Sequence, residues 1–323
     1  MRIVRMNGGL GNQVFQYIFA RFLEESPGSQ VIIDDSHFFL FEDKIKKNKE
    51  DKPQDNLSGT HNGYELEYVF PYATKPNLLS RYFDRDVWEY MVAVMKESSV
   101  PEVSIAQQIL DNGLEDQIAI FEATPQHISD AYNGEKHFTP GNRFNSDLRK
   151  IDGNIYFYGY WINPGYLKAC GETFLRDLTF RPITDARNKQ YEKAILNSAS
   201  VGVHIRRGDF VTLKWDIPNS YYNDQLGKIK SRIPNATFFI FCDNIEWCKA
   251  NAHELGIPPD SAVFVEGNFD YLNNYIDMQL MAMCDILVVG VSSFSYLASL
   301  LSRKKGFQAI QVRGPSLEDV GIG

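Results

Sequence analysis

The stretch VGVHIRRGDF (residues 201–210) is an apolar run that ends in a cluster of charged side chains. Amphipathic stretches typical of helices alternate with further apolar runs downstream. These runs are short and rich in β-branched or aromatic residues: ATFFIFCD (236–243), AVFVEG (262–267), DILVVGV (285–291) and FQAIQV (307–312). Strands that are apolar on both faces and alternate with helices form parallel sheets with helices on both sides. The pattern predicts a doubly wound α/β unit from about residue 185 to the C-terminus.

The first half of the chain begins in the same way. A strand RIVRM (2–6) leads through the turn NGGLGNQ (7–13) into a helical pattern, and a second strand, VIIDD (31–35), follows. IYFYGYW (155–161) is a further predicted strand, and we expect a helix after it through YLKACGETFLRDL (166–178). These elements predict a second α/β unit.

The domain organisation that these patterns favour is two Rossmann-like units. The first takes residues 1–180, with a helical and loop insertion at about 40–150 whose polar part, 42–63, is expected on the surface; the second takes residues 181–323. The basic run 44–49 belongs to that insertion and is interpreted as a solvated loop. Ligands of such sheets bind at the carboxyl ends of the strands, so polar residues there are the candidates for function.

Composition narrows the class of protein. The chain has 323 residues, 44% of them hydrophobic, and a net charge of −8, which argues against a dedicated nucleic-acid binder. No basic and apolar leader opens it, and no apolar run reaches the roughly 20 residues of a bilayer span. The cysteines form no CxxC pair and no zinc spacing, so we expect free thiols in a reducing compartment. We therefore expect a soluble, cytoplasmic protein.

His204, Arg206, Arg207 and Asp209 follow the first apolar strand directly. Buried charges are costly unless they are paired, so this group at a strand end indicates a site and not packing. The planar fork of arginine matches phosphate oxygens bidentately. One arginine can bind a diphosphate while the other pairs with Asp209 or a second oxygen. A structural Arg–Asp pair that holds the loop is the alternative.

The turn from Gly9 to Val14, GLGNQV, has the form GxGxxG without its third glycine. With Asp34 and Asp35 about twenty residues further on, it resembles a dinucleotide-binding fingerprint, which makes an NAD-dependent enzyme one alternative. A tight turn with only a structural role is another. Asn12 and Gln13 instead offer amide groups at the helix start that can bind a sugar or a diphosphate.

Ser292 and Ser293 follow the strand DILVVGV and open a helix. Either serine can cap the N-terminus of that helix. N–H groups and hydroxyls at a positive helix end also suit a phosphate.

Taken together, GGLGNQVFQY (8–17), VHIRRGDF (203–210) and GVSSFSYLASLL (290–301) resemble the three motifs of glycosyltransferase family 11, the inverting α-1,2-fucosyltransferases. The resemblance runs over most of the chain and is weakest between about 40 and 150. The chain departs from the family pattern at Val291, where the family usually has Asn, and at Tyr296-Leu297, where it has an aromatic pair. These departures bear on acceptor preference and catalytic strength.

The resemblance implies a GT-B architecture, with two Rossmann-like domains facing each other across a cleft. It implies GDP-β-L-fucose as the donor, held mainly by the second domain. The acceptor would be a terminal β-galactoside, such as lactose or N-acetyllactosamine, fucosylated on its 2-hydroxyl with inversion. A relative that binds nucleotide sugars without catalysis and a transferase for another GDP-sugar are the alternatives. Peripheral contact with the inner membrane face and the oligomeric state stay open.

The implied catalytic residues are Arg206, Arg207, Asp209 and His204, and the implied donor-binding residues are Gly9, Gly11, Asn12, Gln13, Asp243, Asn244, Ser292, Ser293 and Phe294. Because the two arginines can stabilise the leaving GDP, we expect no metal or other cofactor. Many glycosyltransferases hold a metal with a DxD motif, but Asp84-Arg85-Asp86 here is interpreted as a helix start. Asp243 and Asn244 are candidates for the guanosine moiety. His204 is expected to shape the site, and Asp209 to orient an arginine or to accept the acceptor's proton.

Overall fold

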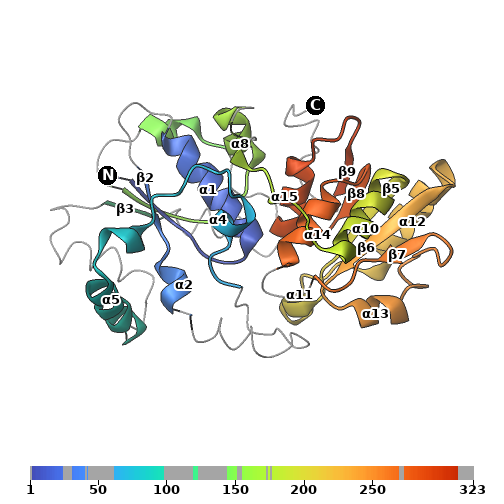
Figure 1. Ribbon diagram of the computed structural model, residues 1–323, viewed down its shortest axis with the longest axis horizontal. Coiled ribbons are helices and arrows are strands. Elements are labelled where there is room, and N and C mark those ends of the chain that lie inside the picture. The colour runs from blue at the N-terminus through green and yellow to red at the C-terminus, as the bar shows by residue number, and fades with distance from the viewer. Residues whose placement is uncertain are drawn as a thin grey trace. The chain divides into compact units, whose positions relative to one another are not determined.

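The computed structural model describes residues 2–24, 31–40, 42, 62–97, 119–122, 144–150, 155–171, 174, 177–268 and 273–311. These residues divide into two compact units, one ending at Thr179 and the other beginning at Phe180 (Figure 1). The basic run 44–49, nearly all of the polar insertion 42–63 and the C-terminal tail lie outside the described residues.

The second unit is built on a parallel sheet with the strand order β7-β6-β5-β8-β9. Its strands within the described residues are β5 (Ala199–Ile205), β6 (Ala236–Cys242), β7 (Ala262–Phe264), β8 (Ile286–Val289) and β9 (Gln308–Gln311). The five strands predicted in this half are therefore confirmed. Their apolar side chains point to both faces, as burial between two helical layers requires.

Helices cover both faces of this sheet (Figure 1). They are α10 (Ala186–Leu196), α11 (Gly208–Leu213), α12 (Asn219–Arg232), α13 (Ile245–Ala250), α14 (Asn274–Met281) and α15 (Ser293–Leu301). Helices α12 and α13 pack Leu226 and Cys248 against Val201 and Val203 of β5. On the opposite face, His204 of β5 lies near Phe294 of α15. The doubly wound arrangement predicted from the sequence is confirmed.

The first unit has its own parallel sheet, with the order β2-β1-β4-β3. Its strands within the described residues are β1 (Arg2–Arg5), β2 (Val31–Asp34), β3 (Ala119–Glu122) and β4 (Ile155–Tyr158). Its helices there are α1 (Leu10–Glu24), α2 (Ser36–Leu40), α4 (Leu66–Val69), η1 (Leu79–Tyr82), α5 (Arg85–Glu97), η2 (Ser146–Lys150) and α8 (Pro164–Cys170). Both units are thus Rossmann-like, which confirms the α/β, GT-B-type fold class.

Helix α1 lies at the centre of the first unit. Its Phe19 ring stacks on the indole of Trp161 with centroids 3.7 Å apart and meets Phe157 of β4 edge-on. Aromatic side chains bury a large apolar area, so these contacts fix α1 against the sheet. The start of α1, and with it the glycine turn, is held accordingly.

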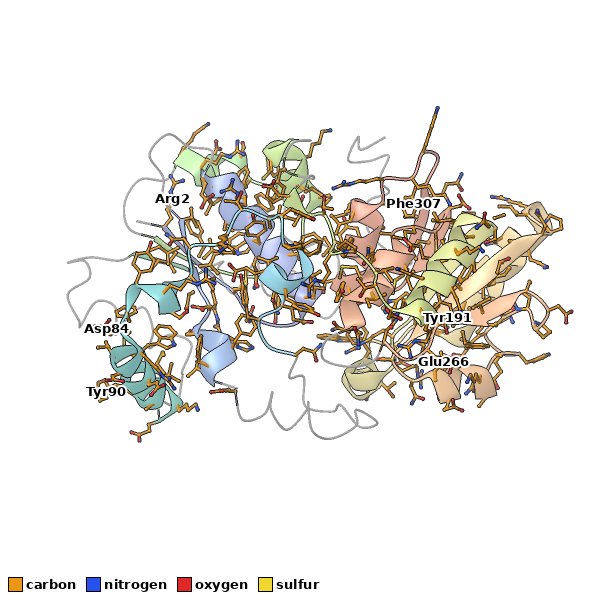
Figure 2. All side chains as sticks on the ribbon, viewed as in Figure 1. Arg2, Asp84, Tyr90, Tyr191, Glu266 and Phe307 are labelled. Atoms are coloured by element: carbon orange, nitrogen blue, oxygen red, sulfur yellow. The ribbon has the colours of Figure 1, made fainter. Side chains whose placement is uncertain are left out.

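Two expectations for the helices have different outcomes. The helix predicted over residues 166–178 is wrong in length, because α8 ends at Cys170 and Gly171 follows with φ 79°, a conformation that favours glycine and stops the helix. The interpretation of Asp84-Arg85-Asp86 as a helix start is confirmed. The carbonyl of Asp84 accepts a hydrogen bond from the N–H of Trp88, and Figure 2 labels Asp84 at the beginning of α5.

Within the described ranges, no helix is both long enough and apolar enough to cross a bilayer.

Candidate functional site

The charged motif lies at the carboxyl end of the sheet in the second unit. Strand β5 ends at Ile205, and its parallel neighbour β6 ends at Cys242, directly opposite in register. The residues that follow, Arg206 on one strand and Asp243 on the other, therefore emerge side by side. This edge is where open parallel sheets bind ligands.

Asp243 holds both arginines of the motif. Its Oδ1 accepts a hydrogen bond from the backbone N–H of Arg207 at 2.8 Å, and its Oδ2 lies 3.0 Å from Nη1 of Arg206. Its side chain is only 5% exposed. A Cβ at Gly208 would meet Oδ2 at 2.8 Å, so glycine is needed there for this approach. Asp243 thus sets the backbone and one guanidinium of the motif at once.

Arg207 is held by two further side chains. Its Nη1 lies 3.0 Å from Oδ2 of Asp216, and its guanidinium carbon lies 3.8 Å from the ring centroid of Trp247. Stacking on an indole combines cation–π attraction with close packing. Neither Asp216 nor Trp247 was a candidate from the sequence. The signal that could have indicated Trp247 is an aromatic residue shortly after the end of the predicted strand 236–243.

We call Arg206 and Arg207, with Asp243, Asp216 and Trp247, the arginine site. Its two cations face two carboxylates, so the resting charge of these four groups is balanced. Each guanidinium carries five N–H donors, more than one carboxylate contact uses. The arginine site therefore offers an anionic ligand two cations whose positions are already fixed, and such a ligand would compete with the carboxylates for part of their hydrogen-bonding capacity.

His204 is buried on the face of β5 opposite to Val201 and Val203. Burial, together with the positive charge of Arg206, lowers the pKa of His204 to about 3. The imidazole is therefore neutral and weakly basic at neutral pH. Its ring lies 6.1 Å from that of Phe294, and its backbone carbonyl accepts a hydrogen bond from the Tyr222 hydroxyl at 3.2 Å. This geometry favours the shaping role over that of a base.

The serine motif begins at the end of β8, the neighbour of β5 on the opposite side from β6. Ser292 has extended backbone angles, and its hydroxyl accepts a hydrogen bond from the N–H of Phe294 at 3.3 Å. The N-cap expected for Ser292 or Ser293 is therefore confirmed for Ser292. Phe294 in turn packs near His204, so the sheet brings the second and third motifs to one edge.

Asn244 and Asp209 are two further candidates near the arginine site. The side-chain oxygen of Asn244 accepts a hydrogen bond from the N–H of Trp247 at 3.1 Å and so caps α13. Asp243 is engaged by the arginines, and the cap engages only the side-chain oxygen of Asn244, so the guanosine role of these two residues stays a prediction. Asp209 lies in α11, and its side chain is outside the described residues, so its role stays a prediction.

In the first unit, the glycine turn joins β1 to α1. Gly8 has φ 78°, and a Cβ there would meet Nδ2 of Asn12 at 2.7 Å, so this position requires glycine. Gly9 accepts the first hydrogen bond of the helix from Gln13. Gly11 lies buried in the first turn of α1.

Gln13 belongs to the framework of this turn. Its amide nitrogen donates to the carbonyls of Gly8 at 2.9 Å and Gly63 at 2.8 Å, and its oxygen accepts from the N–H of Glu65 at 2.9 Å. The side chain is fully buried. A donor-binding role for Gln13 is therefore not supported by this geometry, because backbone groups take up its amide.

Asn12 differs from its neighbour. Its side-chain oxygen is buried and, among the residues that the structure describes, has no hydrogen-bond partner. Buried polar atoms are nearly always hydrogen-bonded, so this oxygen is the group of the turn best placed to take a ligand.

Gln16, which the sequence analysis did not single out, exchanges hydrogen bonds with Asn7 and donates to the carbonyl of Gly159 at 3.0 Å. It ties the turn to the end of β4.

The dinucleotide alternative finds no support in the acidic residues after β2. The carboxylate of Asp34 accepts from the N–H of Ser36, and that of Asp35 accepts from both the N–H and the hydroxyl of Ser80. Burial raises the pKa of Asp35 to about 6. Val14, at the position of the missing third glycine, is fully buried in the core. These carboxylates serve the local fold.

Comparison with known proteins gives the family. The profile of Glycosyl transferase family 11 matches residues 2–318. An α-1,2-colitosyltransferase of Escherichia coli is 35% identical over 158 residues, which cover 47% of this chain and 52% of that protein. The chain thus matches only about half of that relative's length. The O-antigen biosynthesis glycosyltransferase WbnK of Escherichia coli is 21% identical over 312 residues, 92% of this chain and 89% of that protein.

Among solved structures, the fucosyltransferase NodZ from Bradyrhizobium is 13% identical and aligns with a TM-score of 0.47, covering 96% of this chain and 95% of that chain. The family match is the stronger finding, because it extends over nearly the whole chain and contains all three motifs. The chain belongs to glycosyltransferase family 11.

Proposed function

We propose that the chain is an inverting α-1,2-fucosyltransferase that moves L-fucose from GDP-β-L-fucose to the 2-hydroxyl of a terminal β-galactoside. The observation that carries the proposal is the arginine site at the end of β5, where two guanidinium groups are fixed by Asp243, Asp216 and Trp247. Two fixed, forked cations suit a leaving group that consists of two phosphates.

The proposed chemistry follows from charge. Breaking the bond between the anomeric carbon and the phosphate oxygen develops positive charge on the sugar and negative charge on GDP, by analogy with glycoside cleavage. Arg206 and Arg207 stabilise the growing negative charge without having to reorganise. The acceptor hydroxyl attacks the opposite face of the sugar, inverts the centre and loses its proton. Asp209 is the candidate to accept that proton or to orient an arginine.

A second donor is favoured by one observation. The relative at 35% identity is named a colitosyltransferase, and colitose is L-fucose without its 3-hydroxyl. GDP-fucose and GDP-colitose share the diphosphate that the arginine site would bind, so discrimination must come from contacts to the sugar. We assign acceptor binding to the first unit and glycan assembly in the cytoplasm as the setting. Asn12 stays a candidate contact to the donor.

A donor and acceptor screen tests the proposal. Purified protein is incubated with GDP-fucose, GDP-colitose, GDP-mannose or UDP-galactose, each with lactose or N-acetyllactosamine. We expect a product from GDP-fucose that an α-1,2-specific fucosidase cleaves. Turnover of GDP-colitose alone would show that GDP-colitose is the donor in place of GDP-fucose. Binding of GDP-fucose without turnover would favour the non-catalytic alternative.

We also propose that the reaction needs no metal, since the arginines supply the positive charge. The same assay in excess EDTA is expected to keep at least half of the activity. Loss of activity that Mg²⁺ or Mn²⁺ restores would refute this part of the proposal.

A further inference from the structure

Two cysteines lie close together beside the arginine site. Cys242 is the last residue of β6, and Cys248 lies in α13. Their Sγ atoms are 2.7 Å apart, nearer than unbonded sulfur atoms normally approach and not far from the S–S bond length of about 2.05 Å. The other two thiols are elsewhere: Cys170 contacts the carbonyl of Ile18, and Cys284 that of Leu280.

The segment between these two cysteines supports the arginine site. It contains Asp243, which holds Arg206 and the backbone of Arg207, and Trp247, which stacks on Arg207. Asn244 caps the helix that carries Trp247. Any covalent link between Cys242 and Cys248 therefore closes a small ring around the supporting residues.

We propose that Cys242 and Cys248 form a dithiol–disulfide couple, a redox modification site that links β6 to α13 and fastens the segment that holds the arginines. The co-reactant is a low-molecular-weight disulfide such as oxidised glutathione. Only a small approach of the two sulfur atoms is needed, so the bridge forms without displacing Asp243 or Trp247.

The exchange balances in two steps. The thiolate of Cys242 attacks one sulfur of oxidised glutathione, forms a mixed disulfide and releases one glutathione thiolate. Cys248 then attacks the Cys242 sulfur, closes the protein disulfide and releases the second glutathione. The two protein thiols lose two electrons, oxidised glutathione gains them, and the two protons move to the released thiols.

Exposure decides which cysteine reacts first. Cys242 is partly exposed, whereas Cys248 is buried, so Cys242 meets the co-reactant and Cys248 resolves the intermediate. Contact with Cys248 and burial raise the pKa of the Cys242 thiol, so the exchange is slow at neutral pH and accelerates under alkaline conditions. In a reducing compartment the dithiol is the resident form.

The test is incubation of the full chain with oxidised glutathione at alkaline pH, followed by intact mass and peptide mapping. The expected product has lost two hydrogen atoms, and its cross-linked peptide joins Cys242 to Cys248. The melting temperature of the oxidised protein is expected to rise by about 5 °C, and dithiothreitol should reverse the rise. Because the supporting residues stay in place, GDP affinity should change less than threefold.

Variants identify the roles of the two thiols. Cys248→Ser should stop at the mixed disulfide on Cys242, and Cys242→Ser should show neither the bridge nor rapid glutathionylation. Cys284→Ser, the matched control, should still form the bridge. An unchanged mass in the wild type, or a bridge that uses Cys170 or Cys284, would overturn the couple. A bridge that lowers GDP affinity more than threefold would overturn the claim that the segment keeps its geometry. The mass and mapping readouts are independent of the donor sugar.

Discussion

Replacing Asp243 with Asn separates the support of the arginines from their chemistry. Asn keeps the shape and one acceptor oxygen, but it removes the charge and turns an N–H donor toward the guanidinium of Arg206. In the wild type, the Asp243 carboxylate accepts a hydrogen bond of 2.8 Å from the Arg207 N–H and forms an ion pair of 3.0 Å with Arg206, and its side chain is only 5% exposed. A charge-assisted hydrogen bond is worth about 1.5–3 kcal/mol, so we expect a loss of about 2 kcal/mol in the free energy of unfolding.

That loss corresponds to a fall of roughly 4–8 °C in melting temperature. Because Arg206 and the Arg207 backbone lose their common anchor, kcat/KM with GDP-fucose should fall at least tenfold, about 1.4 kcal/mol of transition-state stabilisation. The matched control is Asp224→Asn on α12, whose carboxylate is 53% exposed and pairs with Lys228. Such surface pairs are worth about 0–1 kcal/mol, so this control should keep its activity.

Guanosine without phosphates distinguishes support from direct contact with the base. If Asp243 acts through the arginines, Asp243→Asn should weaken the binding of GDP and leave that of guanosine unchanged. An equal loss of affinity for both ligands would place the base against Asp243. Melting temperature and kcat/KM equal to those of Asp224→Asn would refute the reasoning altogether.

Two further predictions concern other parts of the candidate site. Gln13→Ala removes three buried hydrogen bonds to backbone groups and should cost about 3 kcal/mol in the free energy of unfolding. Asn12→Ala should instead lower activity with little change in melting temperature. Equal stability losses in both variants would contradict the assigned roles. His204 has a folded-state pKa of about 3, below its unfolded value near 6.5, so the unfolded state takes up a proton as the pH falls through this window and wild-type stability declines. Urea unfolding of wild type and His204→Gln at pH 7.5 and pH 5 should show that the wild type loses about 2 kcal/mol more than the variant, and parallel losses would count against a buried neutral imidazole.

Much of the fold could be predicted because the signals are local. The strands of the second unit are apolar on both faces, and their helices alternate with them regularly. Strand β3 (Ala119–Glu122) was not predicted, because it lies in a stretch without clear periodicity. Helix α11 (Gly208–Leu213) was missed as well, since it is short and Arg207 at its N-cap makes no side-chain cap. The end of α8 depended on the backbone conformation of Gly171, which the surrounding pattern did not reveal.

In the candidate site, too, the residues with a local signal in the sequence could be predicted. The arginines and the serine cap could be found because they follow apolar strands directly. Asp243 was a candidate from the sequence, but its pairing with Arg206 could not be predicted, because that contact depends on the register of β6 against β5. Asp216 was not found, because it reaches Arg207 from a loop. Gln13 was assigned to a ligand because an amide in a glycine turn looks the same in sequence whether it binds sugar or backbone.

The central claim is that the arginine pair stabilises the departing diphosphate. The most direct measurement is the single-turnover rate of Arg207→Ala with saturating GDP-fucose and lactose, beside Arg232→Ala at the exposed end of α12 as control. Losing one preorganised stabiliser of transition-state charge typically costs about 10²–10³-fold, so we expect at least a 10²-fold fall for Arg207→Ala and a normal rate for the control. A fall of less than threefold in Arg207→Ala, with the fold intact, would contradict the account.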